Sequence, residues 1–166
     1  MKTRTITLYK DELLYDIEGL AYKFTEGTGL EGKAKNTVAA DHNETLDERL
    51  LTRMIKSRIA QIKDSLTFAL TPMTQDSANN IPANENEFVI SLSLADKFND
   101  NSLDILQTKT HDYVVRGVLL DWYKRLGIQT LAVDGGEVLE LEEAIVSIAR
   151  TPSYTKRPLQ PFGPRK

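Results

Sequence analysis

The sequence predicts a mainly α protein, a bundle of about four helices with a small β element and an extended C-terminal arm. The strongest observation behind this is one long segment, Ser102–Leu126, whose second half is apolar nearly all the way round. The second observation is that apolar residues recur at helical spacing in three further segments, at 11–24, 45–70 and 137–150. Together these segments predict four helices in one chain.

The long segment Ser102–Leu126 predicts the central helix. Between Tyr113 and Tyr123 only Arg116 and Asp121 carry charge. A helix that is apolar on every side is covered on every side, either by its own domain or by other subunits. Gly117, inside this helix, predicts that another backbone comes close to it.

The other helices have clear polar faces. The segment 45–70 begins with a capping box, in which Thr45 precedes Glu48 by three residues, and Pro72 marks its end. Five cations are expected on its outer face: Arg49, Arg53, Lys56, Arg58 and Lys63. Four acids are expected on the solvent side of 137–150: Glu137, Glu140, Glu142 and Glu143.

Two short segments predict the β element. Residues 4–9 and 88–94 alternate apolar and polar side chains, as half-buried strands do. A single strand is not stable alone. We therefore expect the two segments to pair with each other, although a strand of a neighbouring subunit is an alternative partner.

Length and composition indicate one domain of ordinary globular composition. We expect a single helical domain over 1–150, with flexible loops at about 25–44 and 71–87, and an extended tail over 151–166. The net charge of −3 gives no overall attraction to nucleic acid or to an anionic membrane. The sequence has no transmembrane run, and its basic start lacks the apolar core of a secretory signal. The absence of cysteine excludes disulfides, thiol catalysis and cysteine-bound metals.

The sequence predicts no catalytic residue, no metal site and no cofactor. The two histidines, His42 and His111, lie far apart and belong to no metal-binding motif. Asp41, His42 and Glu44 could form a small ligand group, but the spacing of a calcium loop is missing. The glycines near Asp134 and in 27–33 do not form a phosphate-binding motif.

Two functions other than a structural one stay open. The first is an enzyme or small-molecule-binding protein with a pocket near Trp122 and His111, although aromatic residues at helical spacing are more often core residues. The second is a nucleic-acid-binding accessory protein that uses the tail and the Arg53–Lys56 face, although interspersed acids favour a solvated face with ion pairs.

The tail 151–166 is the best candidate for a contact with a partner. It has four prolines, four basic residues and no acid. Such a segment is typical of an extended arm, and large aromatic residues in it would anchor an interface. The alternative is a frayed terminus. The candidate interface residues are Tyr154, Lys156, Arg157, Phe162 and Arg165.

The stretch from about Phe88 to Arg150 resembles the small head–tail connector proteins (neck or head-completion proteins) of tailed phages and prophages. The sequence DYVVRGVLLDWYKRLG, from Asp112 to Gly127, stands in the place of their central helix, and another helix follows. The closing KRPLQPF, from Lys156 to Phe162, is similar to the arms by which ring proteins grip their neighbours. A β-hairpin is common in that group, whereas this sequence predicts only two short separate strands.

The resemblance implies a ring-forming, non-enzymatic part of a virion, assembled in the host cytoplasm. Its implied partners are further copies of the chain and neighbouring virion proteins such as portal or tail components. It implies no membrane partner and no specific contact with nucleic acid. No active-site residue is carried over from the group to this chain.

Overall fold

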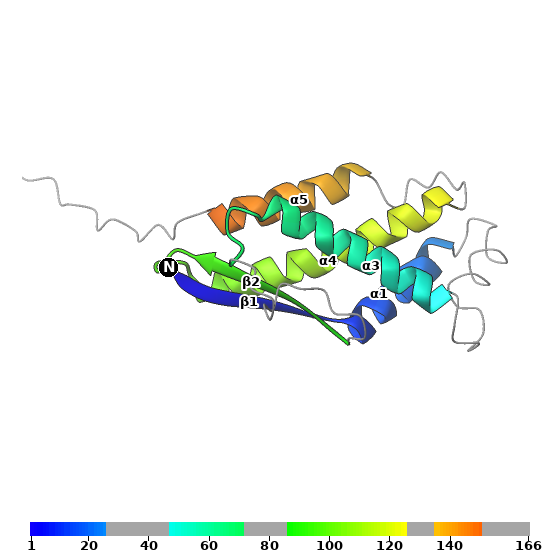
Figure 1. Cartoon of the computed structure of the whole chain (residues 1–166). Helices are drawn as coiled ribbons and strands as arrows, with labels where there is room; N and C mark the ends of the chain where they lie inside the picture. Colours follow the sequence, from blue (N-terminus) through cyan, green and yellow to red (C-terminus); the bar gives the residue numbers. More distant parts are fainter. Residues whose placement is uncertain (26–46, 72–85, 126–134, 151–166) are drawn as a thin grey trace, which may run out of the picture.

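The computed structural model describes residues 1–25, 47–71, 86–125 and 135–150. Over these ranges the chain forms four helices and a small antiparallel sheet, which confirms the predicted fold class (Figure 1). The elements in chain order are β1 (Lys2–Tyr9), α1 (Lys10–Thr25), α3 (Asp47–Ser65), β2 (Glu87–Leu94), α4 (Asp100–Arg125) and α5 (Gly135–Arg150). Nearly all residues of the two predicted loops lie outside the described residues. Thr45 of the predicted capping box and the tail 151–166 also lie outside them.

The two predicted strands pair with each other. β1 and β2 run antiparallel, with Ile6 opposite Ile90 and Thr5 opposite Ser91. Because side chains alternate along a strand, one buried face carries Ile6, Leu8, Phe88, Ile90, Leu92 and Leu94. The Thr and Ser residues fall on the other face, together with Val89. The strands are neighbours in space but not in sequence, so they do not form the hairpin that is common in connector proteins.

The predicted helix 45–70 is wrong at its C-terminal end. α3 ends at Ser65, and residues 66–69 form a turn. The turn brings the chain to the second edge of β2, where Ser93 N donates to Ala69 O at 2.6 Å and Thr71 N donates to Ser91 O at 3.1 Å. The backbone of β2 is thus paired on both sides. These backbone hydrogen bonds to β2 outweigh the helical pattern of residues 66–70.

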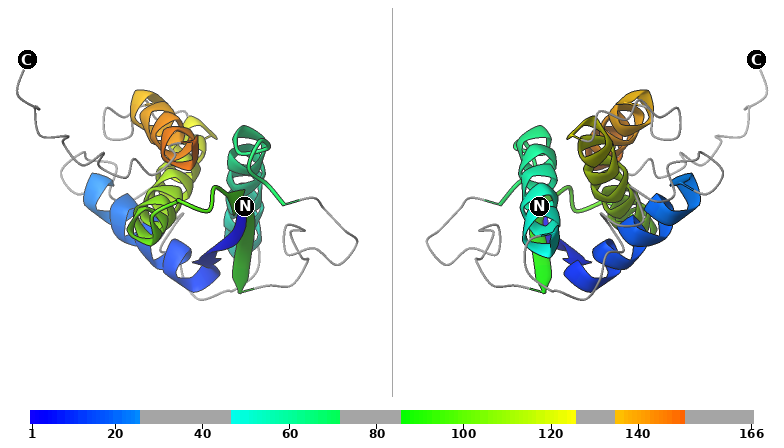
Figure 2. Two further views of the ribbon diagram at one scale, coloured as in Figure 1. Left: turned by 90° about the vertical axis from the view of Figure 1, so that its left-hand side faces the viewer. Right: turned by 90° about the vertical axis from the view of Figure 1, so that its right-hand side faces the viewer.

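α4 occupies the centre of the molecule. It packs against α1, α3, α5 and β1. In the end-on views α3 lies on one side of α4 and α1 on the other, with α5 beside α4 and the sheet beneath (Figure 2). None of the residues from Tyr113 to Tyr123 is exposed. The predicted all-round burial is therefore confirmed, and elements of the same chain provide the cover.

The two faces of the sheet allow a direct test of its register. Ile90 is fully buried, so Ile90→Ala leaves a cavity and should lower the free energy of unfolding by about 2–5 kcal/mol. Thr5 lies on the opposite, exposed face, so Thr5→Ala should cost less than about 1 kcal/mol. Urea unfolding followed by circular dichroism measures both variants.

A register shifted by one residue would reverse this order, because every side chain would move to the other face. Equal losses in the two variants would also contradict the described pairing.

Candidate functional site

The strongest electrostatic feature of the described residues is an ion pair between α3 and α4. Arg58 Nε donates to Asp121 Oδ2 at 2.9 Å, and Arg58 Nη2 donates to Asp121 Oδ1 at 2.6 Å. The side chains are 12% and 33% exposed, respectively. Burial opposes the charge on Arg58, but the hydrogen bond and the charge of Asp121 outweigh it, so the pKa of Arg58 is raised. The pair is two-pronged and largely withdrawn from solvent, which is the stronger kind of ion pair.

Gly117 makes this ion pair possible. A Cβ atom at residue 117 would lie 2.8 Å from Cδ and from Nε of Arg58. The glycine therefore admits the Arg58 side chain, which crosses α4 at this point to reach Asp121. The expectation that another backbone approaches Gly117 is wrong, because the close neighbour is a side chain.

Further polar contacts extend the Arg58–Asp121 pair to α5. Tyr113, buried on α4, has a raised pKa because burial disfavours its charged form, and its hydrogen bond with Arg58 only partly offsets this. Ser65 at the end of α3 donates to a carboxylate oxygen of Glu142 on α5. These contacts hold three helices together. They also correct the expectation for Glu142, which is half-buried instead of facing solvent.

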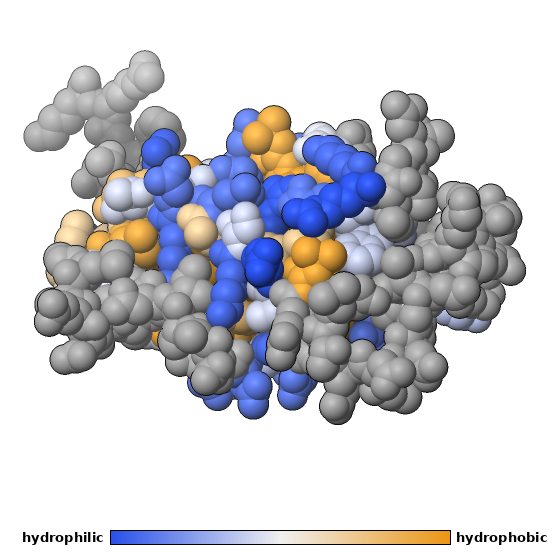
Figure 3. All heavy atoms as spheres, turned by 45° about the vertical axis from the view of Figure 1, so that its right-hand side comes forward, coloured by the Kyte–Doolittle hydropathy of each residue, from blue (hydrophilic) through white to orange (hydrophobic). Residues whose placement is uncertain are grey.

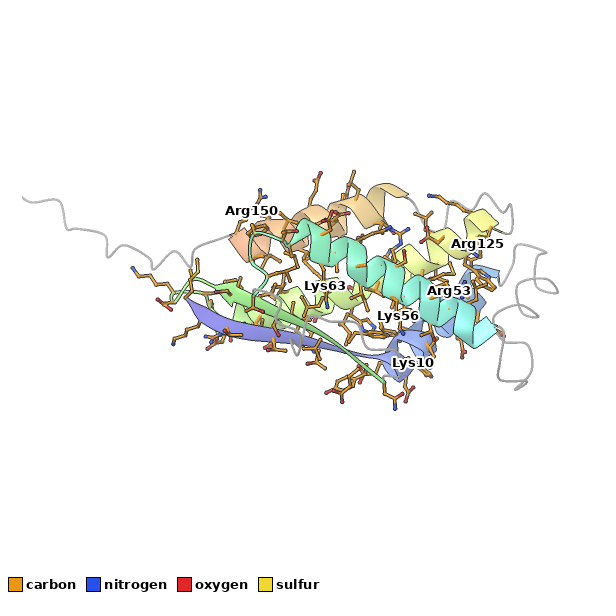
Figure 4. All side chains as sticks on the ribbon, viewed as in Figure 1. Lys10, Arg53, Lys56, Lys63, Arg125 and Arg150 are labelled. Atoms are coloured by element: carbon orange, nitrogen blue, oxygen red, sulfur yellow. The ribbon has the colours of Figure 1, made fainter. Side chains whose placement is uncertain are left out.

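The predicted basic outer face of α3 is smaller than expected. Arg58 is turned inward to Asp121, and Lys63 is only 9% exposed, with a pKa that burial lowers. Arg53 is exposed and Lys56 half-buried, and the two lie toward the start of α3 (Figure 4). The side chain of Arg49 lies outside the described residues. The helix therefore does not present the predicted five-cation face. The nucleic-acid alternative, which uses Arg53, Lys56 and the tail, keeps its two helix residues at least partly at the surface.

The structure does not bring Trp122 and His111 together in a pocket. Trp122 is 4% exposed and belongs to the core. His111 lies at the surface side of α4, where its Nε2 is 2.8 Å from Asp16 Oδ2 of α1. The two residues are separated by three helical turns, about 16 Å along the axis.

Two polar atoms at the end of α4 stay without a partner among the described residues. Trp122 Nε1 and Tyr123 OH are buried and form no hydrogen bond there. Burial raises the pKa of Tyr123. Both side chains belong to the hydrophobic core, and no described cavity is lined by them.

A groove of about 360 Å³ runs between α4 and α5. Arg116 of α4 and Glu137 of α5 form an ion pair there, so opposite charges satisfy each other. No histidine is among the lining side chains, which are Lys109, Asp112, Arg116, Glu137, Glu140, Leu141 and Ala144. The groove therefore contains neither a nucleophile–base pair nor a metal-ligand set.

The remaining sequence-based candidates fall outside the described residues. These are Asp41, His42 and Glu44, and the arm residues Tyr154, Lys156, Arg157, Phe162 and Arg165. Within the described ranges no group of three metal-binding side chains occurs, and none of the helices there is long and apolar enough to span a membrane.

Large hydrophobic side chains reach the surface at several separate places. On the face in Figure 3, hydrophobic residues lie in small areas among hydrophilic ones. Tyr15 on α1 is 77% exposed, and Tyr22 on the same helix 47%. The other exposed large hydrophobic residues of the described ranges are Met1, Tyr9, Phe68, Ile105 and Leu139.

Sequence reasoning missed the Arg58–Asp121 pair, although a signal for it exists. Leu51, Ile55 and Ile62 are buried on α3, and position 58 lies on the same stripe, at the spacing 51, 55, 58, 62. A charged residue inside an apolar stripe needs a buried partner. Asp121, one of two charged residues in the apolar half of α4, is that partner.

The role of Gly117 predicts an unusual response to alanine. Alanine is a better helix former than glycine by about 1 kcal/mol, yet Gly117→Ala should lower the free energy of unfolding by about 1–3 kcal/mol. The loss is expected because the new methyl group displaces Arg58 from Asp121. Gly19→Ala is the matched control, since nothing lies within 4 Å of its Cβ position, and it should stabilise by about 0.5–1 kcal/mol. Thermal unfolding of both variants gives the comparison.

The Arg58→Leu background provides the decisive comparison for Gly117. With the guanidinium removed, Gly117→Ala should become neutral or stabilising. If Gly117→Ala destabilises equally in both backgrounds, the close approach of Arg58 is not the reason for the glycine.

Comparison of the chain with protein-family models, with curated proteins and with solved structures gives no match. The geometry of the described residues is therefore the basis for a functional proposal.

Proposed function

We propose that the chain is a structural adaptor of a tailed-phage or prophage virion, whose copies assemble into a ring within the head–tail connector. Its partners are further copies of itself and neighbouring virion proteins such as portal or tail components. Its role is structural: each subunit occupies a fixed place in the ring and carries out no catalysis.

The main observation behind this proposal is that partly buried charged side chains join the helices to one another. Arg58 and Asp121, whose side chains are 12% and 33% exposed, neutralise each other while joining α3 and α4. Glu142 likewise bridges α5 to α3 through Ser65. Groups arranged in this way stiffen a body and are not available to a substrate.

The order of elements also supports the proposal. The stretch that resembles connector proteins corresponds to β2, α4 and α5. Because α4 is covered by its own chain, a subunit can fold before it assembles and keep its surface for neighbours. From Arg150, the last residue of α5, the chain continues as the basic, proline-rich segment 151–166.

The native mass of the full chain and of a chain lacking residues 152–166 tests this function. The full chain should form closed rings, visible by negative-stain electron microscopy and as one large species by mass photometry. The truncated chain should keep its thermal unfolding midpoint and lose the rings, because the helices and strands that the structure describes are all retained in it.

Two results would count against the proposal. A full chain that stays monomeric at every concentration contradicts ring-type assembly. Rings that persist unchanged without residues 152–166 reject the role of the arm while leaving the ring itself in place.

A further inference from the structure

We propose that the outward face of α1 is the docking site for the proline-rich arm of a second copy of this chain. This inference rests on the proposed ring assembly and adds the binding site that the arm would use. Three properties carry it: an exposed pair of tyrosines, the acids around them, and the proline spacing of the arm.

The tyrosine pair forms an aromatic stripe with a gap in its middle. Tyr15 and Tyr22 are 77% and 47% exposed, and they lie on one side of α1 because a seven-residue separation is close to two helical turns. Gly19 lies between them, and the space above it is open for at least 4 Å. A bound chain can therefore approach the helix backbone between two aromatic rings.

Acidic residues surround this aromatic stripe. At 100° per residue, Asp11 and Glu18 fall on one side of Tyr15 and Glu12 on the other, each within about 60° of it. All three are exposed. Lys23, in the last turn, is the cation on this side of the helix. The charged residues around the aromatic stripe therefore have a net negative charge. An incoming segment with positive charge and apolar rings fits such a face.

The arm has both properties, with a repeat that matches the stripe. Pro158, Pro161 and Pro164 are spaced by three residues, which is the period of a polyproline II helix. One turn of that helix rises about 9.3 Å, and the rise from Tyr15 to Tyr22 along α1 is about 10.5 Å. Successive prolines can thus meet successive tyrosines, in the manner of proline-rich ligands on aromatic grooves.

Charge complementarity extends to both ends of the arm. Basic pairs flank the proline repeat, with Lys156 and Arg157 before it and Arg165 and Lys166 after it, and residues 151–166 contain no acid. The proposed docking would bring these basic pairs to a helix whose outward side carries Asp11, Glu12 and Glu18. The ionic part of the contact should weaken as salt rises.

We assign the bound arm to a second copy because arms that dock on neighbouring copies would link the subunits of the proposed ring. Arg150, the last residue of α5, and Lys10, where α1 begins, lie toward opposite ends of the molecule (Figure 4). A contact between unlike ends of neighbouring copies is heterologous, and such contacts close into rings when the rotation permits.

Photo-crosslinking in the full chain tests the docking site. A benzoyl-phenylalanine placed at Phe162 is irradiated in a mixture of nitrogen-15-labelled and unlabelled protein, and the products are mapped by mass spectrometry. We expect mixed-label crosslinks to α1 peptides that contain Tyr15 or Tyr22. Crosslinks within one copy, crosslinks to another surface, or no crosslink would each overturn the proposal.

Surface variants give the matched control for this crosslink. Tyr15→Ala combined with Tyr22→Ala should reduce the α1 crosslink at least fivefold without changing the circular dichroism spectrum, because both side chains are exposed. Ile105→Ala combined with Leu139→Ala removes two comparably exposed apolar side chains elsewhere and should leave it unchanged. Equal loss in the two double variants would overturn the site.

The native mass of the same samples separates the two proposals. Rings without the α1 crosslink would reject the docking site and leave the assembly function standing. A mixed-label α1 crosslink in open oligomers without rings would support the docking site and reject the ring.

Discussion

The burial of α4 on all sides is the constraint on which the rest of the structure depends. From Tyr113 to Tyr123 eight residues are buried and the other three, Arg116, Leu120 and Asp121, are half-buried, so neighbours must cover most of its circumference. Removing this much apolar surface from water is the main driving force for packing α1, α3 and α5 around it. The sheet closes the remaining side through β1.

The buried charges follow from this central helix. The Asp121 side chain is 33% exposed, and a carboxylate that is largely withdrawn from water needs a partner that reaches it through the packing. Arg58 supplies that partner from α3, and Gly117 leaves the space for its side chain. Gly117 on α4 and Arg58 in the apolar stripe of α3 therefore act together. Their contact fixes how the two helices cross.

The sequence predicts the elements well and their ends and contacts less well. Periodicity predicts α1 and α5, because each buries a regular apolar stripe, whereas α4 is predicted by the nearly continuous apolar run of residues 113–123. It fails after Ser65, where backbone pairing with β2 outweighs a local helical pattern. It also misses the partner of Arg58, since Asp121 lies 63 residues away and only the three-dimensional packing brings them together.

The central claim is that α4 is covered by its own chain, and hydrogen exchange measures this directly. Amide exchange along α4 should be slowest from Val114 to Leu119, and the protection should be the same in dilute monomer and in concentrated protein. Fast exchange of these amides in the dilute monomer, with protection that rises as copies associate, would contradict the account. Neighbouring subunits, in that case, would provide the cover that we assign to α1, α3, α5 and the sheet.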